Sequence, residues 1–266
     1  MEVRLDGRTA VITGASEGLG LAMAQEFAAS GANVAMIARS ADTLEAARES
    51  VVSAIGSNSV RVEAFPCDVT DVSQIESTWT GITDAFGEVD ILVNNAGAHA
   101  IGPFLECSDE RWQADLDLKL FAAIRLCRLA MPGMAERKWG RIINVLAGSA
   151  KAPGAGSAPT SVSRAAGMAL TKVLAGEGAP DNIQVNALLV VQPPDEPDER
   201  RARILLEPEL ALQRELVRHL PGVHRVRAVA KIVVRRQMRV RRRVPLVDVD
   251  AVDDARDARG DELRRR

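Results

Sequence analysis

Residues 13–20 read Thr-Gly-Ala-Ser-Glu-Gly-Leu-Gly and place three glycines between a short apolar run, Thr9 to Ile12, and a helical pattern that stops at Gly31. At a strand-to-helix turn, glycines let backbone N–H groups and a helix N-terminus approach a pyrophosphate. Because this motif opens a strand–turn–helix unit, it predicts a dinucleotide-binding turn. The residues of the turn expected to bind the cofactor are Gly14, Ser16, Gly18, Leu19 and Gly20.

The end of the second apolar run, Asn33 to Ala38, indicates which dinucleotide binds. An acidic side chain at this point would bind the ribose 2′-hydroxyl of NAD, whereas an arginine suits the 2′-phosphate of NADP. The chain has Arg39 and Ser40 there and no acid. We therefore expect NADP as cofactor, with NAD as the alternative because Glu17 in the glycine turn is unfavourable to a phosphate.

These motifs need a scaffold, and the chain alternates apolar runs with helical patterns six times. The runs are continuous, as is typical of strands covered on both faces. This pattern predicts an α/β fold with a doubly wound parallel sheet of the Rossmann type. The expected strands are Thr9–Ile12, Asn33–Ala38, Val60–Phe65, Val89–Val93, Arg141–Leu146 and Ile183–Val190. The expected helices include Ala41–Ile55, Val72–Phe86, Asp109–Met131 and Ser161–Glu177.

Further motifs resemble those of the short-chain dehydrogenases/reductases, most closely the ketoacyl-carrier-protein reductases. They are Asp68-Val69, Asn94–Gly97, the Gly140–Val145 strand and Ile183–Ala187, and with the glycine turn they cover residues 1 to about 190. The resemblance implies NAD(P)(H)-dependent hydride transfer to or from a small carbonyl or alcohol substrate. It places two residues near adenine and three along the ribose. These are Asp68, Val69, Asn95, Ala96 and Gly97.

The catalytic residues of that family are replaced in this chain. The family uses Asn, Ser, Tyr and Lys, with the Tyr and Lys four apart on one helix, but this chain contains no Tyr. Matching the helix motif puts Thr160 at the Tyr position and Arg164 at the Lys position. The same matching puts Lys119 at the Asn position and Ala147 at the Ser position. Threonine is far too weak an acid to replace tyrosine, and arginine does not release its proton.

His99 is the best substitute proton donor, because it lies just past Asn94–Gly97 and an imidazole titrates near neutrality. A local shift would let Ser149 replace the lost serine. The candidate catalytic residues are Arg164, Thr160, Lys119 and His99. If none of them replaces the tyrosine, the alternative is a cofactor-binding protein with little or no turnover.

Charge divides the chain near residue 191. Residues 1–191 hold 15 basic and 22 acidic residues, whereas residues 192–266 hold 19 and 14 and contain no aromatic residue, Ser, Thr or Asn. We therefore expect an NADP-binding domain at 1–191 and an atypical, poorly ordered Arg-rich tail at 192–266. Val190-Val191 stand where the family has Pro-Gly, and a frame shift would produce such a tail. Nucleic-acid binding through Arg235–Arg243 is a second alternative, weakened by the lack of aromatic residues for stacking.

The remaining composition favours a cytoplasmic enzyme without metal. The net charge is −2, the start of the chain has no apolar signal core, and no apolar run approaches the roughly 18 residues of a membrane helix. The three cysteines form no CxxC or Cys/His cluster and are expected as free thiols. We expect a homodimer or homotetramer through a small-residue helix face. That face consists of Ala165, Ala166, Ala169 and Val173.

Overall fold

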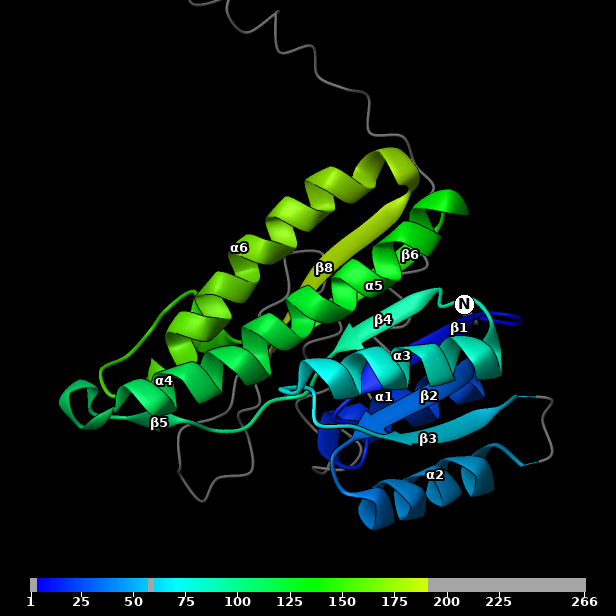
Figure 1. The fold of residues 1–266 in the computed structure, drawn as a ribbon, viewed down its shortest axis with the longest axis horizontal. Coiled ribbons are helices and arrows are strands. Elements are labelled where there is room, and N and C mark those ends of the chain that lie inside the picture. Colours follow the sequence, from blue (N-terminus) through cyan, green and yellow to red (C-terminus); the bar gives the residue numbers. More distant parts are fainter. Residues whose placement is uncertain (1–3, 57–59, 191–266) are drawn as a thin grey trace, which may run out of the picture.

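The computed structural model describes residues 4–56 and 60–190 (Figure 1). They form a six-stranded parallel sheet in the order β3-β2-β1-β4-β6-β8, so the predicted doubly wound fold is confirmed. The strands are β1 (Thr9–Thr13), β2 (Asn33–Ala38), β3 (Val62–Pro66), β4 (Ile91–Asn94), β6 (Gly140–Ala147) and β8 (Ile183–Val190).

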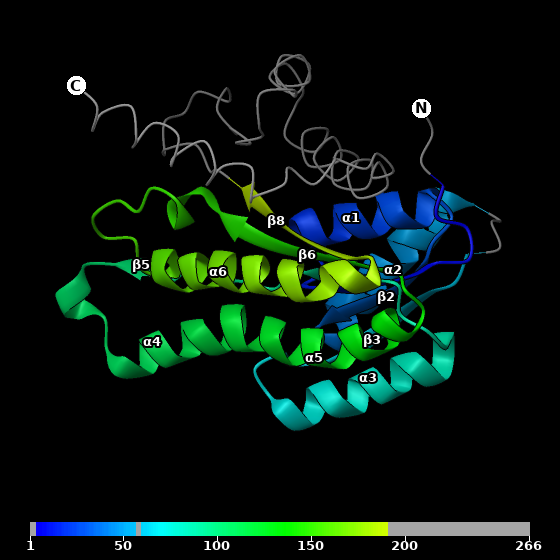
Figure 2. The same ribbon diagram turned by 90° about the horizontal axis from the view of Figure 1, so that it is seen from above.

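Helices cover both faces of the sheet, with α1 and α2 on one face and α3, α5 and α6 on the other (Figure 2). The alternation of side chains along β1 explains why its apolar run is continuous. Ala10 and Ile12 pack into the core beneath α1 and α2, while Val11 packs into the core beneath α3 and α5. The helices are α1 (Gly18–Ala29), α2 (Ala41–Ile55), α3 (Val72–Phe86), α4 (Asp109–Leu116), α5 (Ala122–Glu136) and α6 (Thr160–Gly178).

Several element bounds differ from the expected ones. The third strand begins at Val62 rather than Val60, where it first pairs with Val34 of β2. The fourth begins at Ile91, which pairs with Ala10 of β1 and Arg141 of β6. The preceding Asp90 accepts hydrogen bonds on its carboxylate from Arg8 and from the backbone N–H of Thr9.

The long helix expected at 109–131 is divided and extended. A π-helical turn at Asp117–Phe121 separates α4 from α5, and α5 continues to Glu136. The continuation has a packing reason: Leu126, Ala130 and Met134 recur on one buried face, and Met134 is fully buried.

A two-stranded antiparallel sheet was not expected. It pairs β5 (Ile101–Gly102) with β7 (Ala158–Pro159), and so joins the loop after β4 to the start of α6. This pairing fixes two segments that are far apart in the sequence on either side of the candidate site.

The predicted tail at 192–266, including Arg235–Arg243, lies outside the described residues, as does Val191. Within residues 4–56 and 60–190, no helix has the length and hydropathy to span a membrane. In the same part of the chain, no group of three or more His, Cys, Asp or Glu side chains is arranged to hold a metal ion.

A buried polar link connects the carboxyl end of β4 and the middle of β6 to α6. Asn94 Nδ2 donates to Asn144 Oδ1 at 2.8 Å, and Asn144 Nδ2 donates to Thr171 Oγ1 at 2.9 Å. Asn144 is 3% exposed, so water cannot replace these bonds.

Asn144→Ala should lower the free energy of unfolding by about 2–3 kcal/mol, because it removes both bonds and leaves buried polar partners. Thr171→Val removes the acceptor of Asn144 Nδ2 and the bond from the Thr171 hydroxyl to the Gly167 carbonyl oxygen, which lies within the same helix; it should cost about 1 kcal/mol, because the link between Asn94 and Asn144 remains. Equilibrium denaturant unfolding measures both. Equal losses for the two variants would contradict the assigned bridging role of Asn144.

Candidate functional site

The glycine turn lies at the carboxyl end of β1, where the strand order reverses between β1 and β4. This is the position at which doubly wound sheets bind their ligands. Gly14 and Gly18 have φ angles of +63° and +56°, values that residues with a side chain rarely adopt. A Cβ on Gly20 would lie 2.0 Å from the carbonyl oxygen of Gly14. The turn therefore has the side-chain-free backbone that a dinucleotide cradle requires.

Asn95 fastens this turn to the end of β4. Its Nδ2 donates to the carbonyl oxygens of Thr13 and Gly14 at 3.0 and 3.1 Å. In return, the Thr13 hydroxyl oxygen accepts the backbone N–H groups of Asn95 and Ala96 at 2.9 and 3.0 Å. The structure thus brings Asn95 and Ala96 against Gly14. Thr13 begins the glycine motif, but that motif alone does not predict its role in joining the turn to β4.

The residues expected at the adenosine end follow the neighbouring strands β2 and β3. Arg39 and Ser40 are exposed, and the Ser40 hydroxyl caps α2. Asp68 Oδ1 accepts hydrogen bonds from the N–H and hydroxyl of Thr70 at 2.9 and 2.8 Å, and Val69 is buried. Because β2 and β3 pair in parallel, their ends place these residues along one edge of the sheet.

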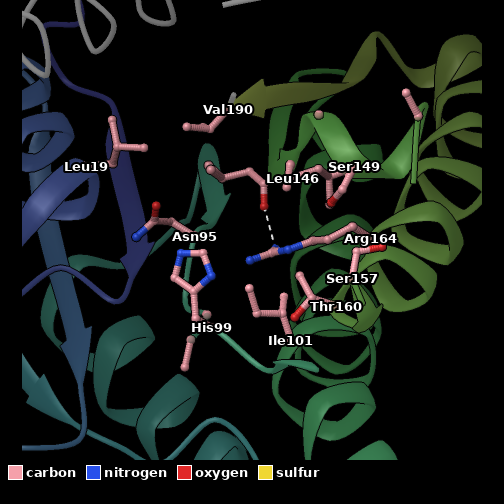
Figure 3. A pocket seen from close by; sticks show the side chains of 16 residues that line it. Leu19, Asn95, His99, Ile101, Leu146, Ser149, Ser157, Thr160, Arg164 and Val190 are labelled. Carbon is pink, nitrogen blue, oxygen red and sulfur yellow. Dashed lines mark hydrogen bonds between the residues drawn. The ribbon is translucent and has the colours of Figure 1, made fainter. Parts of the chain in front are cut away.

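A cavity of about 670 Å³ opens beside the carboxyl ends of β6 and β8 (Figure 3). Its walls come from the start of α1, the loop after β4, the end of β6, the start of α6 and Val190 of β8. Of the expected site residues, it collects Leu19, Asn95, Gly97, His99, Thr160 and Arg164, together with Ala147 and Ser149. Ser16 and Lys119 are not among the lining residues.

Lys119 lies behind the cavity in a buried polar cluster. It forms an ion pair with Asp115 in which each side chain is 1% exposed. Its Nζ donates to the Thr160 hydroxyl at 2.7 Å, and that hydroxyl also lies 3.2 Å from both the N and the O of Ala100. Ser163 donates to the other oxygen of Asp115 at 2.6 Å. The Thr160 hydroxyl is therefore occupied by protein partners.

Electrostatics in this cluster follow from its burial. Loss of water is the largest influence on the pKa of Lys119 and lowers it, although the hydrogen bond to Asp115 opposes the change. The pKa of Arg164 is likewise lowered by burial, against the attraction of Asp115. The two positive charges are therefore less well solvated here than at the surface, so a nearby anion stabilises them more strongly than it would there.

Arg164 enters the cavity from α6. Its Nη1 donates to the carbonyl oxygen of Val145 on β6 at 2.7 Å, a bond drawn in Figure 3. Its buried Nε has no hydrogen-bond partner. A Cβ on Gly97 would lie 2.4 Å from Nη2, so the guanidinium occupies space that this glycine leaves free.

His99 is the only histidine within the described part of the chain; its side chain is exposed and lines the same cavity as Arg164 (Figure 3). The structure therefore brings together His99, Thr160 and Arg164 at the cavity wall, while Lys119 reaches the site only through Thr160.

The family model of the short chain dehydrogenases matches residues 8–192. The chain belongs to the short-chain dehydrogenase family. D-beta-hydroxybutyrate dehydrogenase of Cupriavidus necator is 34% identical over 69% of this chain and 70% of its own length. The 3-oxoacyl-(acyl-carrier-protein) reductase of Vibrio cholerae is 33% identical over 70% of this chain and 73% of its own.

Solved structures agree with this assignment. L-sorbose reductase from Gluconobacter frateurii, complexed with NADPH and L-sorbose, is 38% identical, with a TM-score of 0.68 over 73% of this chain and 74% of its own. An NAD+-bound xylitol dehydrogenase is 28% identical, with a TM-score of 0.66 over 70% of each chain. The predicted short-chain dehydrogenase family and its NAD(P)(H)-dependent oxidoreductase function are therefore confirmed.

Two members of the polar cluster were missed in the sequence. Asp115 precedes Lys119 by four residues, and Ser163 follows Thr160 by three, so each pair falls on one helix face. The sequence therefore contained the spacings from which each pair could have been predicted. Those spacings predict a pair on each helix, but they do not predict that α4 and the following π-helical turn pack against α6 and bury both pairs together.

Gly20→Ala should weaken NADPH binding at least about tenfold, which corresponds to roughly 1.4 kcal/mol, because the Cβ has to displace a backbone carbonyl of the turn. Gly176→Ala is the matched control, since a Cβ there meets nothing within 4 Å. Fluorescence titration with NADPH measures both. Unchanged affinity in a folded Gly20→Ala protein would show that this turn does not hold the cofactor.

Proposed function

We propose that this short-chain dehydrogenase prefers NADP(H) and transfers hydride between it and a small carbonyl or alcohol compound held in the 670 Å³ cavity. One observation carries the proposal: the turn at Gly14 and Gly20, which has no side chains, lies next to Asn95. Asn95 donates a hydrogen bond to the carbonyl oxygen of Gly14 and also lines the cavity. One continuous site thus serves the dinucleotide and a second molecule.

The preference for NADP(H) rests on Arg39. This exposed side chain follows β2, where the binding of a 2′-hydroxyl would call for an acid. A guanidinium at that point offers a charge-assisted bond to a phosphate. The related structures include both an NADPH complex and an NAD+ complex, so the choice for this chain depends on its own residues.

The proton, in this proposal, comes from His99. A bound nicotinamide would supply the hydride to the carbonyl carbon, and His99 would donate the proton to the carbonyl oxygen. Thr160 is a poor source because its hydroxyl is held by Lys119 and Ala100. Arg164 stays protonated and orients bound groups by its charge and N–H donors.

A protein that binds the cofactor with little or no turnover is the second candidate. It is favoured by the absence of tyrosine from the chain and by Ala147, which lacks a hydroxyl, at the matched serine position. A cytoplasmic location and a homodimer or homotetramer stay as proposals drawn from the sequence. So does the third candidate, nucleic-acid binding through the tail, whose residues are not described.

Arg39→Gln should reduce the preference for NADPH over NADH about tenfold or more, since a charge-assisted bond contributes roughly 1.5–3 kcal/mol. Titration of both cofactors, followed by nicotinamide fluorescence, measures the ratio. Arg48→Gln is the control, because Arg48 is paired with Glu45 on the surface of α2. Equal affinities of the unchanged protein for the two cofactors would contradict the assignment.

His99→Gln should lower kcat about a hundredfold, the scale of general acid catalysis, while leaving NADPH affinity within about twofold. Carbonyl-dependent oxidation of NADPH, measured over a panel of small ketones and aldehydes, provides the rate. A rate that does not change in His99→Gln would remove His99 from the mechanism. Tight NADPH binding without oxidation by any carbonyl would instead support the second candidate.

A further inference from the structure

The wall of the cavity divides into two parts by the segments that build it. Gly97 and the guanidinium of Arg164 lie against each other in the part expected to hold the ribose of the cofactor. Another part of the wall comes from Ile101 of β5 and from the segment after β6, which contributes Ser149 and Ala152. This second part is where a substrate has to be recognised.

The hydroxyl groups of the cavity differ in how far the protein already uses them. Of the described residues that line it, three carry a hydroxyl. The Ser157 hydroxyl donates to the carbonyl oxygen of Gly154 at 2.6 Å, and the Thr160 hydroxyl is held at 2.7 Å by Lys119. The Ser149 hydroxyl has no hydrogen-bond partner among the described residues. A bound molecule is therefore able to use it without breaking a bond within the protein.

The surroundings of Ser149 make this hydroxyl selective. The residue is half-buried in the short turn Gly148–Ala150, and Ile101, Leu146 and Val190 are apolar side chains that line the same cavity. A polar group that enters an apolar site without a partner loses its bonds to water. A serine hydroxyl both donates and accepts, so it suits the oxygen of a neutral hydroxyl, ether or carbonyl group.

Ser149 and the proposed proton donor lie apart. Figure 3 shows His99 and Ser149 on different walls of the cavity. His99 comes from the loop after β4, whereas Ser149 comes from the turn after β6. A carbonyl oxygen that takes its proton from His99 therefore lies toward one wall and leaves Ser149 to another group of the same molecule.

We infer that Ser149 determines specificity by binding a second oxygen of the substrate, so that hydroxy ketones, hydroxy aldehydes and the corresponding diols are preferred over plain ketones and alcohols. The inference rests on the proposed function in taking this cavity as the substrate site. It goes further by giving the substrate a second polar group and by naming the side chain that recognises it.

The test compares ligands in which a hydroxyl replaces a methyl group of similar size. The pairs are hydroxyacetone and butanone, 4-hydroxybutan-2-one and pentan-2-one, and 5-hydroxypentan-2-one and hexan-2-one. Ligand-observed NMR measures their affinities with and without NADP+, which cannot reduce a ketone. In at least one pair the hydroxy compound should bind about threefold or more tightly, the scale of one neutral hydrogen bond. Equal or tighter binding of the plain ketone in all pairs would overturn the inference.

Variants then assign the preference to one side chain. Ser149→Ala removes a hydroxyl that holds no part of the described protein, so the fold should remain. The preference should disappear or reverse, because the ligand hydroxyl would then lie in an apolar wall without a partner. Ser149→Thr keeps a hydroxyl and should retain a larger share. Ser157→Ala is the matched control and should leave the ratio within about twofold, since that hydroxyl is bonded to Gly154. An unchanged preference in Ser149→Ala would overturn the assignment.

Failure of the inference and failure of the proposed function are distinguishable. Absence of NADPH binding would reject the proposed function and leave the ratio of ligand affinities measurable without cofactor. Tight NADPH binding beside equal affinities within every pair would reject only the inference. If none of the compounds binds, the inference is overturned together with the substrate site that it assumes.

Discussion

The Thr13 hydroxyl and the Asn95 amide tie the carboxyl ends of β1 and β4 together through hydrogen bonds of 2.9 to 3.1 Å. A doubly wound sheet opens a crevice between these two strands, because the helices that follow them leave toward opposite faces. Without a cross-link, the glycine turn and the loop after β4 would be free to separate there. These four bonds keep the backbone around Gly14 and Gly20 against the wall of the cavity. A small group of polar contacts thus sets the geometry of both halves of the site.

The opposite wall depends on a different kind of contact. A buried ion pair loses much of its Coulombic gain to desolvation unless hydrogen bonds satisfy its remaining donors and acceptors. Thr160 and Ser163 supply such bonds to Lys119 and Asp115, and Thr160 also contacts the backbone of Ala100. Together with the pairing of β5 and β7, this cluster fixes the loop after β4 to the start of α6. Residues at positions matched to family catalytic groups thus stabilise the wall.

Local patterns were sufficient for most of the fold. The bounds of α2, α3 and β2 match the expected ranges, because each has strong periodicity or an apolar run that ends at a polar or glycine residue. Strand β8 also has the expected bounds, Ile183–Val190. The β5–β7 pair has two residues in each strand, too few for any periodicity. The polar cluster was missed for another reason. It forms only where α4 and the π-helical turn at Asp117–Phe121 meet α6, and sequence spacing does not determine that contact.

Arg164 stands at the position matched to the family's lysine. A lysine is able both to bind by its charge and to release a proton, whereas an arginine only binds. A guanidinium does not give up its proton near neutral pH, even where burial lowers its pKa, so it contributes a constant positive charge and fixed N–H directions. A reduction that consumes a proton then needs a second group to donate it, and His99 is the proposed donor because it lines the same cavity and is exposed to solvent. On this proposal, binding and proton donation are assigned to two different side chains, whereas a lysine at the same position could serve both.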